Sequence, residues 1–117
     1  MNTALLHTSS GAHALVVRLA DNFASRLRGL MLAPPLAQDH GLLLTRCGSV
    51  HSAFMRQTID VIYLDRHGRV LRCVAALGPW RASICRGAAH VLELAAGSIA
   101  CYRIAPGDRL LHACFRR

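Results

Sequence analysis

The chain has 117 residues, 53% of them apolar, and a formal net charge of +8. This length and apolar content are typical of one folded domain, residues 1–117, and argue against a disordered chain. All 14 basic residues are arginine. They are spread along the chain and aromatic residues are only 5%, which disfavours nucleic acid as the partner.

The N-terminal third predicts one strand followed by one short helix. Residues 14–20, ALVVRLA, are apolar and β-branched, as in a strand. Asp21 or Asn22 can cap a helix, and apolar residues then recur at helical spacing over 23–31, with Leu27 and Met31 in the buried stripe. The pair Pro34-Pro35 ends this helix.

The middle of the chain predicts strands and one clear hairpin. Residues 41–46 and 49–55 are short strand candidates. Two apolar runs, 60–65 and 69–75, flank the sequence DRHG. Asp65 fits the first position of a type I turn, and Gly68 supplies the left-handed residue that follows it.

The C-terminal third reads as a loop and two strands. Residues 77–88 hold Gly, Pro and Ser and are typical of a loop. A strand follows that ends at Gly97, and the turn at 105–108 leads into a last strand over 109–115. Short strands at regular spacing with one early helix predict a mainly β fold, a small β-sandwich or barrel with one short α-helix near the N-terminus.

The five cysteines have no C-x-x-C spacing, and an odd number argues against a disulfide framework. We expect most of them to be buried as small apolar residues. The N-terminus lacks the pattern of a signal peptide and no stretch is long enough to span a membrane. The prediction is therefore a cytoplasmic protein, with association with the cell envelope as the alternative.

Candidate site residues concentrate near residues 50–60. Alternation along a strand places His51 and Met55 on one face, with Asp60 entering on the next strand. A histidine beside a carboxylate is held in one tautomer and can act as a base. Arg28, just off the apolar helix stripe, could turn inward and pair with Asp60 or with an anion.

Purely structural roles for the same residues also stay open. A histidine in a strand is more often structural than a ligand, and an aspartate that opens a strand is often a turn or cap residue. Two further alternatives are a copper site of His51, Met55 and Cys47, and a carboxylate pair of Asp60 with Glu93. We predict no metal and no cofactor, and a candidate ligand pocket formed by Arg28, His51, Met55 and Asp60.

The order of short motifs carries a family resemblance. The motifs lie at residues 28–31, 41–43, 51–56, 59–65, 92–97 and 106–108. In this order they resemble the bacterial and archaeal family called domain of unknown function 192, over residues 14–111, and we expect a bacterial member. The resemblance implies a small mainly β fold and no established reaction. Arg103 departs from the pattern, because glycine is usual there.

The sequence favours a binding protein over an enzyme, with a small ligand or a protein partner. One alternative is a small hydrolase that uses His51 and Asp60. Another is an interaction module without a pocket, in an envelope or secretion system. A concave pocket that holds His51 and Asp60 would favour the first two readings over the third.

Overall fold

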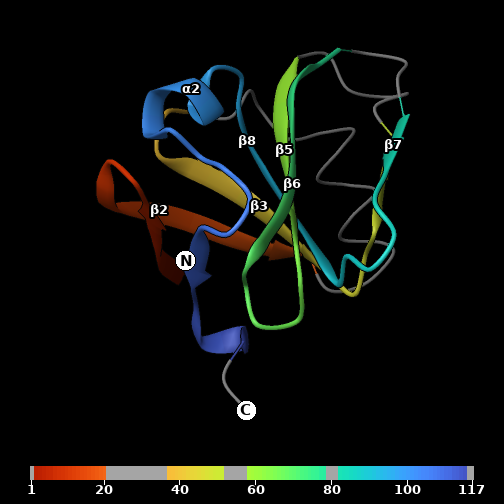
Figure 1. Ribbon diagram of the computed structural model, residues 1–117, viewed down its shortest axis with the longest axis horizontal. Helices are drawn as coiled ribbons and strands as arrows, with labels where there is room; N and C mark the ends of the chain where they lie inside the picture. Colours follow the sequence, from red (N-terminus) through yellow and green to blue (C-terminus); the bar gives the residue numbers. More distant parts are fainter. Residues whose placement is uncertain (1, 21–36, 52–57, 79–81, 116–117) are drawn as a thin grey trace.

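The structure is a computed structural model that describes residues 2–20, 37–51, 58–78 and 82–115 (Figure 1). Its main sheet has the order β6 (Val70–Leu77), β5 (Ile59–Leu64), β8 (His90–Ala95), β3 (His40–Thr45), β2 (Gly11–Ala20), β1 (Asn2–Thr8) and β9 (Arg109–Leu111). A second sheet pairs β4 (Ser49–His51) with β7 (Ala82–Ile84). The predicted mainly β fold is confirmed.

The main sheet curls until its two edge strands meet. Only β2 and β3 are parallel among its pairs, and the others are antiparallel. Three backbone hydrogen bonds of 2.8 Å join the edges. Val70 N–H donates to the Asp108 carbonyl, and Gly107 N–H donates to the Val70 carbonyl. Leu110 N–H donates to the Gly68 carbonyl. These bonds satisfy backbone groups that open edges would expose, and they make the sheet barrel-like.

The predicted hairpin of β5 and β6 is confirmed. Gly68 N–H donates to the Asp65 carbonyl at 3.1 Å, and Gly68 has φ +88°. The Asp65 carboxylate accepts from the N–H groups of His67 and Arg69 at 2.8 and 2.9 Å. Side-chain bonding to the local backbone is the reason aspartate favours such turns.

The helix predictions have two outcomes. The helix expected over residues 23–31, with Leu27 and Met31, lies outside the described residues. The α-helix that the structure describes is α2 (Ser98–Tyr102), on the C-terminal side of the chain. Its C-cap is Arg103, with φ +57°. This left-handed conformation suits glycine better than arginine.

Several strand predictions need correction. The last strand is only Arg109–Leu111, because the chain then turns into the 3₁₀-helix η1 (Ala113–Phe115). The predicted loop over 77–88 contains β7. Strand β1, which pairs with β9 from distant sequence, was not predicted.

Side-chain alternation divides the core into two clusters. The inner cluster fills the curl of the sheet and includes Leu6, Leu15, Leu43, Ile62, Leu92 and Leu110. The outer cluster lies on the other face of β3, β5, β6 and β8 and consists of Leu42, Leu44, Ile59, Val61, Tyr63, Leu77 and Val91. Cys47 and Cys85, which flank β4 and β7, pack against the outer cluster, so the small sheet adjoins that face.

Candidate functional site

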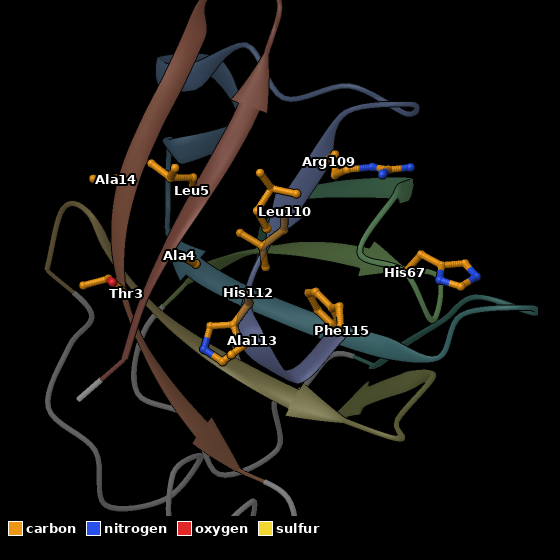
Figure 2. Close-up of a pocket in the computed structure, with 11 residues that line it drawn as sticks. Thr3, Ala4, Leu5, Ala14, His67, Arg109, Leu110, His112, Ala113 and Phe115 are labelled. Carbon is orange, nitrogen blue, oxygen red and sulfur yellow. The ribbon is translucent and has the colours of Figure 1, made fainter. Parts of the chain in front are cut away.

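A groove of about 770 Å³ lies where β1, β9 and η1 meet (Figure 2). Its apolar lining is formed by Ala4, Leu5, Leu110, Leu111 and Phe115. Leu5 and Leu111 are partners across β1 and β9, and each is 44% exposed. Together with the other apolar residues of the groove, they offer a surface that an apolar group of a ligand or partner could cover.

The local chain path of residues 109–115 forms this groove. Strand β9 ends after three residues, and η1 begins two residues later. Cys114 N–H donates to His112 Nδ1 at 3.0 Å, and Phe115 N–H donates to the His112 carbonyl at 3.1 Å. These bonds turn the chain back, so Phe115 is buried against the hairpin turn at Gly68.

Three basic side chains line the groove: His67, Arg109 and His112. Figure 2 shows Arg109 and His67 extending toward the same side of the view, away from Thr3 and Ala14. Among the described residues, no carboxylate forms an ion pair with Arg109. The guanidinium therefore has its full set of donors available at the rim of the groove.

The hydrogen bonds of the two histidines fix which nitrogen can serve a ligand. His112 Nδ1 accepts from Cys114, so the neutral ring carries its proton on Nε2. His67 Nε2 lies 3.3 Å from the donating Nε of Arg66, which places the His67 proton on Nδ1. Burial lowers the pKa of His112, so this ring is a neutral hydrogen-bond donor at neutral pH.

The charge around the groove is strongly one-sided. Arg69 and Arg109 occupy directly opposite positions in an isolated bridge, and like charges in that relation repel. Burial raises the pKa of Asp65, but backbone hydrogen bonds from Arg69 and His67 outweigh it and hold that pKa below its usual range. Asp65 is thus ionised and offsets only part of this positive charge.

Asp60, one of the predicted site residues, is buried in β5 and has three backbone donors. Ala76 N–H donates to Oδ1 at 2.9 Å. Gly97 and Ile99 N–H donate to Oδ2 at 3.1 and 2.8 Å. The carboxylate therefore caps α2 and anchors β6 at Ala76, where φ is +55°.

The structure describes only one of the three other predicted site residues. Arg28 and Met55 lie outside the described residues. His51 is the last residue of β4, where it pairs with Ala82 of β7. Because β4 belongs to the second sheet, it is not the strand next to β5, whose neighbours are β6 and β8. The pairing of His51 with Asp60 stays a prediction that the three donors of Asp60 do not favour.

The carboxylate pair of Asp60 with Glu93 does not form. Asp60 is opposite Leu94 and Val61 is opposite Glu93 in the β5–β8 ladder. Alternation therefore places Asp60 on the inner face and Glu93 on the outer face of the sheet. The copper site of His51, Met55 and Cys47 stays a prediction, because Met55 lies outside the described residues.

The cysteines differ from the expectation of burial. Cys101 and Cys114 are exposed and the other three are only partly buried. None of the five, all of which lie in described segments, is joined in a disulfide. Within the same segments, no helix is long and apolar enough to cross a membrane.

Sequence reasoning missed the groove because its lining comes from β1, the β5–β6 turn, β9 and η1, which are far apart in sequence. The single available signal was the run RLLH at 109–112, in which Arg109 and His112 bracket two leucines. Alternation would have predicted one leucine facing inward and one outward. The structure agrees, with Leu110 buried and Leu111 exposed.

Comparison with known proteins gives the family. The sequence model of DUF192, described as "Uncharacterized ACR", matches residues 5–112. The chain belongs to the DUF192 family. A UPF0127 protein of Pyrococcus furiosus is 36% identical over 111 residues, which cover 91% of this chain and 95% of the relative. A UPF0127 protein of Pyrococcus abyssi is 36% identical over 101 residues, 80% of this chain and 83% of the relative.

Two solved structures share the DUF192 fold described above. One, from Sinorhizobium meliloti 1021, has a TM-score of 0.87 and 30% identity, and the match covers 97% of this chain and 94% of that one. It is described as a candidate transcription regulator. The other, from Novosphingobium aromaticivorans, has a TM-score of 0.84 at 24% identity, over 92% and 82% of the two chains. Because the curated relatives are archaeal, the expected bacterial assignment is too narrow.

Proposed function

We propose that this DUF192 protein binds a small amphipathic carboxylate in the groove between β1, β9 and η1. The observation that carries the proposal is the groove itself, in which exposed leucines adjoin an arginine without a carboxylate partner among the described residues. Its volume of about 770 Å³ lies within the range of small-molecule sites.

The ligand class follows from the two halves of the lining. Leu5, Leu111 and Phe115 offer an apolar surface that favours an alkyl or aryl tail. Arg109 offers a planar fork of donors that matches a carboxylate in a bidentate pair. His112 adds a neutral Nε2–H donor, because its Nδ1 is already occupied. One fixed positive charge of this kind suits an anion that carries one negative charge.

Two alternatives receive less support. A hydrolase would use Asp60 as the partner of a catalytic histidine, but three backbone N–H groups already donate to this carboxylate, which leaves one of its roughly four acceptor positions. An interaction module without a pocket does not account for the groove. We therefore propose a binding function without a reaction.

Nucleic acid remains an alternative anion, because the Sinorhizobium meliloti relative is described as a candidate transcription regulator. The exposed arginines of the described residues, such as Arg18, Arg72 and Arg103, lie on different strands and at the end of α2. A duplex or single strand is bound by basic side chains gathered on one surface. We expect fluorescence anisotropy with a labelled duplex to show only weak, salt-sensitive binding.

The direct test is a titration of the ¹⁵N-labelled protein with sodium octanoate, followed by amide chemical shifts. We expect the shifts to concentrate in β1, β9 and η1. Acetate, which lacks the tail, and 1-octanol, which lacks the charge, should each bind more weakly than octanoate. Arg109→Gln should weaken octanoate binding by roughly tenfold or more, as expected for a lost charged hydrogen bond.

Arg86→Gln is the matched control, because Arg86 is an exposed arginine in a turn outside the groove. Equal affinities of octanoate for the Arg86→Gln and Arg109→Gln variants would refute the proposal, and so would shifts of the same size with acetate. The residues Arg28, His51 and Met55 stay predicted ligand contacts. Their alanine variants, tested in the same titration, decide whether any of them contributes.

The partner and the location remain predictions as well. A small ligand is proposed here in preference to a protein partner, and co-purified molecules released by denaturation can be identified by mass spectrometry. The cytoplasmic location inferred from the sequence can be tested by cell fractionation.

A further inference from the structure

A buried carboxyl group on the far side of the sheet has no role in the groove. Glu93 of β8 is 1% exposed, and its neighbours across the ladders are Leu42 of β3 and Val61 of β5. Its Oε2 has no hydrogen-bond partner. Burial raises its pKa to about 7.

A second orphaned polar group lies on the same face. Tyr63 is fully buried and its hydroxyl has no partner in hydrogen-bond geometry. Burial raises the Tyr63 pKa, and the nearby Ser83 hydroxyl offsets part of that effect. Tyr63 is opposite Val91, two residues before Glu93, so the two groups are diagonal neighbours on one face. Within the described part of the chain, these are the two buried side-chain polar atoms without a partner.

The small sheet lies over this face. Arg72, the partner of Tyr63 on β6, donates to the Ile84 carbonyl of β7 at 3.0 Å. Cys47 and Cys85 pack against the outer cluster, beside Tyr63. Tyr63 is thus placed between the main sheet and β7, and Glu93 lies on the same face of the main sheet.

Folding alone does not account for this arrangement. An apolar side chain of similar size at position 93 would complete the outer cluster without a buried unpartnered oxygen, which is costly. Buried polar groups that the fold does not use are characteristic of functional sites. The carboxyl group needs a donor, and an ionised carboxylate is best satisfied by a cation that brings several N–H groups.

We infer that Glu93 and Tyr63 form the polar end of a second ligand site, between the outer cluster and β7, that binds a small ammonium or guanidinium compound. This site lies on the opposite face of the sheet from the inner cluster and is independent of the carboxylate groove. Because Glu93 is 1% exposed, the ligand must displace atoms that cover it, and binding should be slow.

The probe is n-butylammonium, with 1-butanol as its uncharged analogue. At about pH 8.5, above the Glu93 pKa of about 7, butylammonium should shift the amides of β5 and β8, and butanol should not. At about pH 5.5 its affinity should fall by roughly tenfold or more, because the protonated carboxyl group no longer attracts a cation. Other titratable groups also face this side, namely Tyr63, Cys47, Cys85 and Arg72. Substituting each of them in turn shows whether it contributes to the pH dependence of butylammonium binding.

Glu93→Gln should abolish the butylammonium shifts, and Tyr63→Phe should weaken them. Asp39→Asn, at an exposed carboxylate elsewhere, is the control and should leave them unchanged. The inference is overturned if butanol binds as well as butylammonium, or if Glu93→Gln binds butylammonium like the parent protein while its amide spectrum shows a folded chain. Octanoate binding should be unaffected by Glu93→Gln, and butylammonium binding by Arg109→Gln, so the two sites fail separately.

Discussion

At the scale of single residues, Asp60 and Glu93 show how two buried acids on neighbouring strands come to differ. Asp60 faces the inner side of the sheet, where the N-terminus of α2 and the backbone of Ala76 supply three donors. Glu93 faces the outer cluster and has none for Oε2. Asp60 therefore stabilises the fold, whereas burial of Glu93 without a donor destabilises it, which points to a role in function.

The anchoring role of Asp60 predicts a large loss of stability on truncation. Asp60→Ala leaves three buried N–H groups without an acceptor and should lower the free energy of unfolding by roughly 3–5 kcal/mol. Urea denaturation followed by circular dichroism measures it. Asp39→Asn, at an exposed position, should change stability by less than about 0.5 kcal/mol. A loss of that small size for Asp60→Ala would contradict the anchoring role.

The raised pKa of Glu93 predicts a distinctive dependence of stability on pH. The folded-state pKa of about 7 exceeds the ordinary value of 4.5, so the folded chain holds the proton more tightly than the unfolded chain. The proton on Glu93 therefore adds to the free energy of unfolding below about pH 4.5, and this stabilisation is lost as the pH rises through about 7. At about 1.4 kcal/mol per pKa unit, the loss is about 3 kcal/mol.

Glu93→Gln removes this titration. Urea melts between about pH 4 and pH 8.5 should show the variant gaining stability relative to the parent protein as the pH rises. Comparison of the two proteins cancels His90 and His112, whose pKa values burial lowers and whose effect on stability has the opposite sign. A constant difference between the two curves would show that Glu93 does not titrate in this range.

At the scale of secondary structure, local chemistry decided which elements could be predicted. The β5–β6 hairpin was found because Asp65 and Gly68 define its turn within a few residues. Helix α2 was missed because its N-cap, Gly97, has no capping side chain and the acceptor comes from Asp60, distant in sequence. Likewise β7 was missed because it is short and depends on its pairing with β4, which the sequence pattern does not reveal.

The candidate sites followed the same rule. For Asp60 the sequence left open a role as a turn or cap residue, which the structure confirms, but its donors lie on two other elements, so the groups that it caps could not be predicted. The groove requires Leu5 and Leu111 to be neighbours, a contact between the two ends of the chain. Glu93 was noticed only as a possible partner of Asp60, because its isolation depends on which face of β8 is covered.

The end of α2 offers a test at this scale. Arg103 has φ +57°, which costs an L-residue roughly 1–2 kcal/mol, whereas glycine adopts it freely. Arg103→Gly should therefore raise the free energy of unfolding by about 0.5–1 kcal/mol after the entropy cost of glycine. Ala100→Gly, inside the same helix, should lower it by about 1 kcal/mol. A thermal melt of the two variants checks both signs, and destabilisation by Arg103→Gly would contradict the argument.

At the scale of the whole molecule, the meeting of the sheet edges depends on one residue without a side chain. A Cβ atom at Gly68 would overlap the Leu110 carbonyl oxygen and lie 2.8 Å from Phe115 Cδ2. Both contacts belong to the segment that closes the sheet and forms the floor of the groove. Closure and the groove are therefore coupled through this turn.

Gly68→Ala should consequently lower the free energy of unfolding by more than the positive φ of this residue alone explains. Gly87 is the matched control, because its φ of +84° is close to the +88° of Gly68 and a Cβ there would meet nothing within 4 Å. We expect Gly87→Ala to destabilise by about 1 kcal/mol and Gly68→Ala by roughly 2–4 kcal/mol. Hydrogen exchange should also become faster at the amides of Val70 and Leu110. Equal costs for the two variants would show that the edges tolerate the added methyl group.

The pairing of β1 with β9 also constrains when the protein can fold. Leu5 lies beside Leu111, so β1 is synthesised long before its neighbour β9. The edge bonds at Gly68 and Val70 likewise require residues 107–110. Contacts this distant in sequence are slow to form. During synthesis, the apolar side chains of β1 therefore lack their contact with β9 until residues 109–111 have been made, an interval in which a chaperone could hold them.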